Sequence, residues 1–192
     1  MNPAIHAAWA LLLHRATGFP DVLFGSVASG RSCDVANIDR MPGLVVATQP
    51  LRSRPGADST VGAWLRLLQL QMAEMREHEH TPLALIQQWS EVPPAKRPLF
   101  DSIVVVGNYA GNDLTALSGG GLAIENVESF TQPLYALTLF VVVGRKVRLR
   151  LVYERKRLSL PTAIELLGEY RSVLREMAAN PQRLVAGLMR RT

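Results

Sequence analysis

The chain has 192 residues, of which 48% are hydrophobic and 19% charged. This is the composition of a globular protein, and the length suits one domain with its own core. Cys33 is the single cysteine, which rules out an intramolecular disulfide and fits a reducing cytoplasm. The longest apolar run, 134–143, is too short to span a bilayer, and the first residues lack a secretory leader. We therefore expect a cytoplasmic protein that does not enter a membrane.

A formal net charge of +5 raises the question of nucleic-acid binding. The basic residues are scattered, and they are dense only at 145–157 and at 190–191. Few aromatic residues lie among them to stack on bases. The charge pattern therefore favours a basic surface that meets an acidic protein partner, with no nucleic acid involved.

The first quarter of the chain predicts a helix and two strands. Residues 4–15 are apolar all round, which is typical of a mostly buried helix, and Gly18 supplies its end. A short strand over 21–27 and a long loop over 29–42 follow. Residues 43–51 predict a second strand, and because its middle is apolar on both faces we expect it in the interior of a sheet.

The clearest helix of the sequence begins at Ser59 or Thr60, either of which can cap it. Apolar residues then recur at steps of three and four: Val61, Trp64, Leu65, Leu68, Met72 and Met75. The helix should end near His80, because Pro82 disfavours helical geometry in the residue before it. A shorter helix over 83–89 and an extended connector over 93–98 follow.

The second half of the chain predicts a strand over 102–106, because this run is β-branched, and then a loop over 107–121 that is rich in Gly, Asn, Asp and Ser. Residues 134–143 and 147–153 predict a hairpin. The second arm alternates apolar and mostly polar residues, so one of its faces should be wet.

A final helix begins around Pro161, a residue favoured in the first turn, and stops at Asn180-Pro181. We place the domain at 1–184 and the start of a linker at 185–192. Helices interspersed with strands predict an α/β fold, namely a two-layer sandwich with a mixed sheet.

Two histidines, His78 and His80, are the obvious candidates for a metal site. Two residues apart, they do not share a helix face as the i, i+4 pair of a zinc protease does, and no third ligand is close in sequence. We expect no metal here, with one histidine buried and hydrogen-bonded and the other solvated.

Other catalytic patterns are incomplete. Ser26 lacks the flanking glycines of a nucleophile elbow. Cys33 has arginines near in sequence, but an incidental free thiol is the simpler interpretation. The run 118–121 lacks the Lys and Ser/Thr of a phosphate-binding loop. Arg31 remains, because an arginine after Ser29-Gly30 can hold a carboxylate with two hydrogen bonds. An ordinary surface arginine is the alternative.

Four segments, in order, resemble the condensation domain of non-ribosomal peptide synthetases. They are 24–31 (FGSVASGR), 41–52 (MPGLVVATQPLR), 78–86 (HEHTPLALI) and 99–109 (LFDSIVVVGNY). The resemblance runs from about residue 8 to about 184 and covers the second half of such a domain. The family's catalytic HHxxxDG motif belongs to the first half, so the resemblance implies that this chain is inactive alone.

The resemblance further implies one of two chloramphenicol-acetyltransferase-like halves that enclose a tunnel. Carrier proteins present the substrates on phosphopantetheine, so no cofactor is bound directly. The partners implied are the N-terminal condensation subdomain, peptidyl carrier proteins and adjacent synthetase domains. Arg31 is the implied organiser of the active site, 121–131 the latch to the first half, and the floor of the tunnel contains Ser29, Gly30, Gly43, Ala47 and Thr48.

Some family positions differ in this chain. Ala47 stands where the family has an amide, Gly107 where it has an acid, and Ser32-Cys33 where Pro is common. The strand at 44–50 favours condensation over the related epimerisation domains. These differences leave open a degenerate binding module that recruits a carrier protein or tailoring enzyme without catalysis. An independent hydrolase or acetyltransferase is the third interpretation, but no histidine lies in a catalytic-looking motif.

Overall fold

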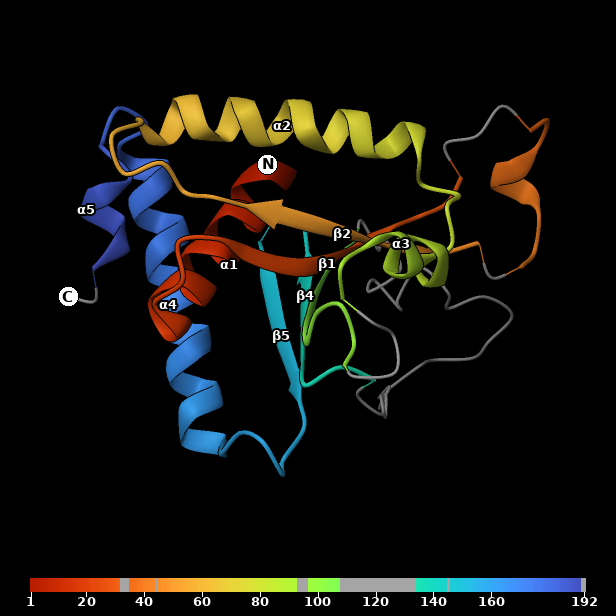
Figure 1. Cartoon of the computed structure of the whole chain (residues 1–192). Coiled ribbons are helices and arrows are strands. Elements are labelled where there is room, and N and C mark those ends of the chain that lie inside the picture. Colours follow the sequence, from red (N-terminus) through yellow and green to blue (C-terminus); the bar gives the residue numbers. More distant parts are fainter. Residues whose placement is uncertain (32–34, 44, 93–96, 108–133, 145, 191–192) are drawn as a thin grey trace, which may run out of the picture.

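The computed structural model describes residues 1–31, 35–43, 45–92, 97–107, 134–144 and 146–190. Figure 1 shows helices and strands mixed along the chain, with the long helices gathered beside one sheet. In chain order the elements are α1 (Asn2–Thr17), β1 (Val22–Ala28), the short 3-10 helix η1 (Ile38–Arg40), β2 (Ala47–Ser53), α2 (Val61–Glu77), α3 (Leu83–Trp89), β3 (Ser102–Gly107), β4 (Leu137–Val142), β5 (Arg148–Tyr153), α4 (Leu160–Ala179) and α5 (Ala186–Met189).

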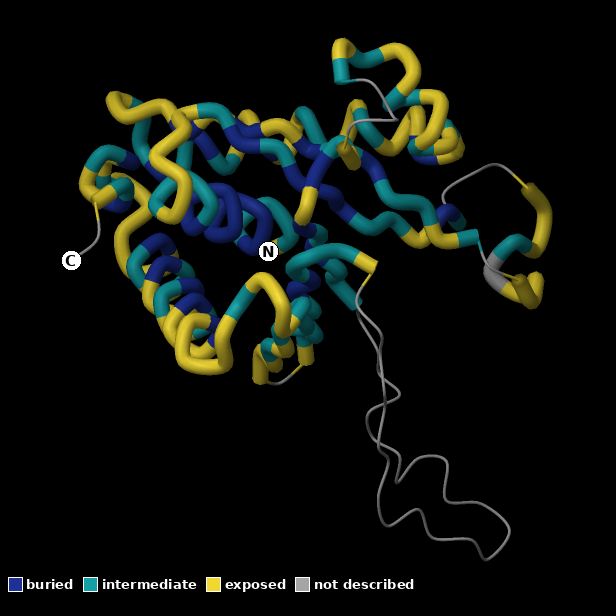
Figure 2. Tube along the Cα trace, turned by 60° about the horizontal axis from the view of Figure 1, so that its bottom comes forward, coloured by how far each residue is buried: buried dark blue, intermediate teal, exposed yellow. Residues whose placement is uncertain are grey.

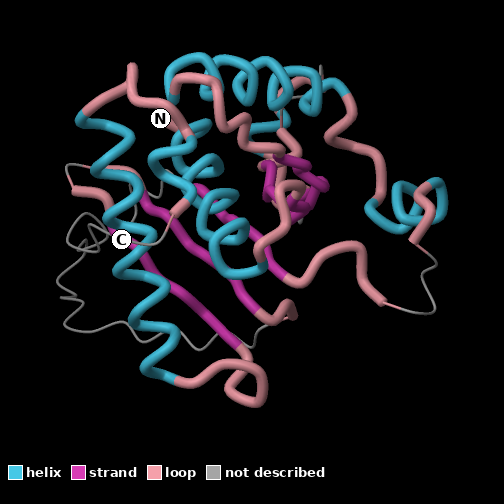
Figure 3. Tube along the Cα trace, turned by 60° about the vertical axis from the view of Figure 1, so that its left-hand side comes forward, coloured by secondary structure: helices cyan, strands magenta, loops and turns pink. Residues whose placement is uncertain are grey.

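The five strands form one sheet in the order β2-β1-β3-β4-β5. Strands β1, β3 and β4 run parallel, whereas β2 and β5 pair antiparallel at the two edges. Helices α1 and α4 pack against each other and against the sheet, and α2 packs against α1 and β2. Figure 3 shows the long helices lying over one face of the strands. The predicted α/β sandwich with a mixed sheet is therefore confirmed.

Strand β2 corrects the prediction of an interior strand, because it lies at the edge of the sheet and begins only at Ala47. The apolar residues 45–46 precede it. Pro50, which pairs with Gly25, explains the edge position, since proline has no N–H to donate to a second neighbour. On the outer side, the Gln71 side chain donates to the carbonyl of Arg52 at 2.9 Å.

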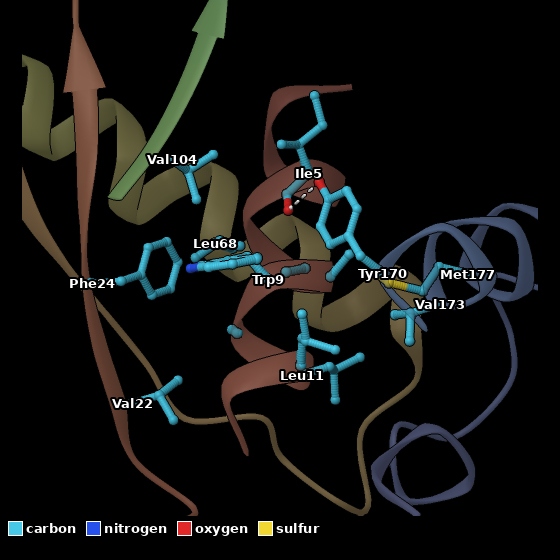
Figure 4. Close-up of a cluster of buried hydrophobic side chains, with 14 of the residues drawn as sticks. Ile5, Trp9, Leu11, Val22, Phe24, Leu68, Val104, Tyr170, Val173 and Met177 are labelled. Carbon is cyan, nitrogen blue, oxygen red and sulfur yellow. Dashed lines mark hydrogen bonds between the residues drawn. The ribbon is translucent and has the colours of Figure 1, made fainter. Parts of the chain in front are cut away.

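Helix α1 lies in the centre of the core, as its apolar sequence predicts. Residues 5–12 are all buried, and Gly18 ends the helix in the left-handed conformation with φ 74°. Figure 2 shows the buried residues concentrated in this helix and the central strands. In Figure 4, Trp9 and Phe24 lie between α1 and the sheet, while the Tyr170 hydroxyl donates to the Ile5 carbonyl at 3.1 Å.

The cap predicted for α2 is present, and α4 has a cap of the same kind. The Thr60 side chain accepts from the Ala63 N–H at the start of α2, and Ser159 accepts from the Thr162 N–H at the start of α4. Each bond satisfies one of the N–H groups that a helix terminus leaves without an intrahelical partner. No helix among the described residues combines the length and apolar character required to cross a bilayer.

The C-terminal tail differs from the predicted linker at 185–192. Val185 and Leu188 are fully buried, and residues 186–189 form α5. Backbone bonds from Val185 and Ala186 reach the carbonyls of Ser59 and Ala57, next to the start of α2. The folded unit thus extends to residue 189, because two apolar side chains fill the gap beside the α2 cap. The predicted loop at 107–121, apart from Gly107, and the predicted latch at 121–131 lie outside the described residues.

Candidate functional site

The carboxyl ends of the three parallel strands meet at one end of the sheet, where Ala28, Gly107 and Val142 lie. Strand β2 starts at this end, and α2 finishes there. In open α/β sheets, ligands bind beyond the carboxyl ends of the strands. Two cavities lie at this end, and they define the candidate site.

Arg31 follows β1 directly and turns back on its own segment. Its Nη1 donates to the carbonyl oxygens of Ile38 and Met41, the latter at 3.0 Å, and its backbone N–H donates to Ser29 Oγ at 3.4 Å. These bonds close the turn that contains η1. Arg31 therefore holds carbonyl oxygens within the described residues, and the carboxylate partner that the sequence suggested is not among the partners seen here.

Gly30 lies against the backbone of Val45 in the site. It is buried at φ 67°, and a Cβ atom placed on it would lie 1.6 Å from the carbonyl oxygen of Val45. No side chain fits between these backbones. The 29–31 turn and the segment entering β2 are therefore in direct backbone contact, and only glycine allows it.

The first cavity has a volume of about 480 Å³ and contains three of the predicted floor residues, Gly30, Ala47 and Thr48. Apolar side chains of Ile38, Val45 and Leu83 and the ring of Tyr135 complete much of its wall. Ser29 lines the second cavity instead. Gly43 is exposed and lines neither, so the structure separates it from the other predicted floor residues.

Glu79 lies between the two cavities and lines both of them. It is 1% exposed although it follows the end of α2, and its Oε1 lies 3.8 Å from Nε2 of His80. Both His78 and His80 are exposed, which corrects the expectation that one would be buried. The turn after α2 points its middle residue, Glu79, inward and the two histidines outward.

The second cavity has a volume of about 730 Å³ and a polar floor. Ser26 Oγ lies 2.9 Å from Nε2 of His6, and Nδ1 of His6 lies 3.0 Å from the Asn2 carbonyl oxygen. Burial lowers the pKa of His6, whose side chain lies under the cavity rather than in it. Gln49 pairs with Ser26 across the strands and donates its Nε2 to the Met75 carbonyl at 2.9 Å.

Sequence reasoning missed His6 and Gln49. Gln49 is a polar residue on a strand face whose other members are buried, such as Phe24 and Leu51 beside the Ser26–Gln49 pair. That strand alternation was a usable signal. His6 gave none, because its partner comes from a different element.

Among the residues that the structure describes, no three His, Cys, Asp or Glu side chains converge. Cys33 and the glycine run 118–121 lie outside the described residues.

Residues 1–189 match the family model described as the condensation domain. The chain is 38% identical over 188 residues to a linear gramicidin synthase of Brevibacillus parabrevis, covering 98% of this chain and 4% of that protein. It is 40% identical over 182 residues to chondramide synthase cmdD of Chondromyces crocatus, covering 94% of this chain and 5% of that protein. The chain therefore belongs to the condensation domain family of non-ribosomal peptide synthetases.

Solved structures share the fold. The crystal structure of the protein named CT matches with a TM-score of 0.79 and 24% identity, over 100% of this chain and 43% of CT. A four-domain nonribosomal peptide synthetase bound to AMP and glycine matches with a TM-score of 0.79 and 17% identity, over 96% of this chain and 15% of that protein. This chain thus spans a small part of its curated relatives and less than half of CT.

Proposed function

We propose that this chain is the C-terminal half of a peptide-bond-forming condensation domain and supplies one wall of its substrate tunnel. The observation that carries the proposal is the family match over residues 1–189, with both cavities at the carboxyl ends of the parallel strands. The matched length is 43% of CT. The four histidines, at 6, 14, 78 and 80, include no adjacent pair, and in this proposal the HHxxxDG motif belongs to the other half of the domain.

The reaction joins two thioesters held on the phosphopantetheine arms of carrier proteins. The amine of the acceptor attacks the thioester carbonyl of the donor, a C–N bond forms, the C–S bond breaks, and the amine proton leaves with the thiol. This chain contributes no catalytic residue to that step. Its part is to shape the tunnel with Gly30, Ala47 and Thr48, which line one cavity, and Ser29, which lines the other.

Arg31 acts as a positioning residue in this proposal. Its guanidinium uses Nη1 for the carbonyls of Ile38 and Met41, and a guanidinium has five N–H donors in all. The remaining donors can take a carboxylate of the partner subdomain while the turn stays closed. One side chain would then fix the floor of the tunnel and the motif of the other half together.

The test combines this chain with a separately produced N-terminal subdomain containing HHxxxDG and with two loaded carrier proteins. Amide formation is expected only when both halves are present. Arg31→Ala should lower kcat by more than about tenfold, because a misplaced motif slows the reaction. Arg40→Ala is the matched control, since Arg40 is an exposed arginine of the same segment with no side-chain hydrogen bond within the described residues. Turnover by this chain alone would refute the proposal.

A binding module without catalysis is the second candidate, motivated by Ala47 and Gly107 at altered family positions. It predicts that the two halves and a carrier protein associate while no amide forms. Pull-down and product analysis of the same mixture separate the two functions.

A further inference from the structure

The floor of the larger cavity presents hydrogen-bond acceptors. The Asn2 carbonyl oxygen can only accept, so the hydrogen of the neutral His6 ring lies on Nδ1, which donates to it. Nε2 of His6 is then an acceptor, and the Ser26 hydroxyl donates its only hydrogen to it. The lone pairs of Ser26 Oγ remain for another donor.

Gln49 adds a second acceptor. It is 6% exposed, and its Nε2 is occupied by the Met75 carbonyl, which fixes the orientation of the amide. Within the part of the chain that the structure describes, no hydrogen bond reaches its Oε1. This oxygen keeps accessible surface, so a ligand in the cavity can donate a hydrogen bond to it.

Asn2 adds a third. Its Oδ1 is buried and has no hydrogen-bond partner among the described residues. Asn2, Ser26 and Gln49 come from α1, β1 and β2, and all three line the same cavity. The lining also has apolar residues, among them Met72, Met75 and Val106, and two charged ones, the exposed Arg76 and the buried Glu79.

We propose that this cavity of about 730 Å³ is a side-chain pocket for an aminoacyl or peptidyl group with an apolar stem and an N–H donor. A carboxamide and an ammonium share that chemistry. A purely apolar side chain would leave the acceptors without partners, and a carboxylate would face lone pairs. The inference rests on the proposed function only in taking the ligand to be an aminoacyl group.

Binding to the full chain tests the pocket directly. The probes are N-acetylcysteamine thioesters of glutamine, ornithine, leucine and glutamate, which differ only in the side chain. Methionine-methyl NMR reports their position, because Met72 and Met75 line the cavity whereas Met177 lies in the core at 2% exposure. The glutamine and ornithine probes should shift Met72 and Met75 but not Met177, with Kd at least about tenfold lower than for the other two.

Two variants identify the acceptors. Gln49→Leu should remove the preference for N–H donors, and Gln71→Leu should keep it. Gln71 is a matched control because it too ties α2 and β2 through one side-chain-to-backbone bond, away from this cavity.

Equal binding of all four probes, or shifts at Met177 instead of Met72 and Met75, would overturn the inference. The ratio of the Kd values for the glutamine and ornithine probes then shows whether the pocket prefers a neutral carboxamide or a charged ammonium. Amide formation by the assembled halves without this discrimination would leave the proposed function standing and refute the pocket. If the chain discriminates between the probes but the assembled halves form no amide, the pocket stands and the proposed function is refuted.

Discussion

Replacing Gly30 by alanine tests the central feature of the site, the backbone contact between Gly30 and Val45. The new Cβ would start 1.6 Å from the Val45 carbonyl oxygen, and real contacts of this kind stay beyond about 3 Å. The segment entering β2 must therefore retreat from the turn. The left-handed φ of 67° adds a further cost of about 1–2 kcal/mol for a residue with a Cβ. Together we expect a loss of at least about 3 kcal/mol in the free energy of unfolding.

Gly18→Ala is the matched control. Gly18 has a φ of 74°, and nothing lies within 4 Å of a Cβ placed on it. This variant therefore has only the backbone cost, about 1–2 kcal/mol. Urea unfolding of both variants and the parent chain gives the two differences. If Gly30→Ala costs no more than Gly18→Ala, the close contact is not part of the folded protein, and the arrangement of the floor residues argued above is wrong.

Three more outcomes are expected. A chain that ends at Leu184 should lose about 3–6 kcal/mol in the free energy of unfolding by urea, because it no longer buries Val185 and Leu188. A chain that ends at Arg190 should match the parent, and equal stability of the two truncated chains would show that residues 185–189 are a linker. As the pH is lowered from about 7.5 to 5.5, the free energy of unfolding should fall, because His6 binds a proton near its ordinary pKa of 6.5 in the unfolded chain while burial lowers its pKa in the folded chain. His6→Gln should reduce this fall, and an unchanged dependence of stability on pH would contradict the reasoning. Tyr170→Phe should cost about 1 kcal/mol in thermal or urea unfolding because the buried hydrogen bond from its hydroxyl to the Ile5 carbonyl is lost, while Tyr153→Phe, at a partly exposed position, should cost little.

Local rules predicted the helices well. The spacing of apolar residues, the cap Thr60 and the first-turn Pro161 each act within a few positions, so the helix starts could be predicted from the sequence. Gly18 and Pro82 likewise marked where helices stop or cannot continue.

Strand order was harder to predict, because it depends on partners far along the chain. The apolar run before Ala47 indicated an interior strand, whereas Pro50 indicated an edge, and the structure shows that Pro50 was the better guide. The same limit applies to the site. Ser26 is 20 residues from His6, and Gln49 is 26 residues from Met75, so neither contact has a local signature. Arg31 was singled out for its donors, and its observed acceptors are backbone carbonyls that no sequence motif specifies.

Stability and ligand chemistry occupy different ends of this fold. Trp9, Leu11 and Tyr170 pack in the core between α1, α4 and the sheet, where the Trp9 indole and the Tyr170 hydroxyl both have hydrogen-bond partners. At the carboxyl ends of the parallel strands the Asn2 side-chain oxygen is instead buried with no donor among the described residues, and Gly30 is held against Val45. Such features lower the stability of a folded chain unless something else uses them. Asn2 and Gly30 line the two cavities that share Glu79, and this is the physical reason for placing the proposed function at this end of the molecule.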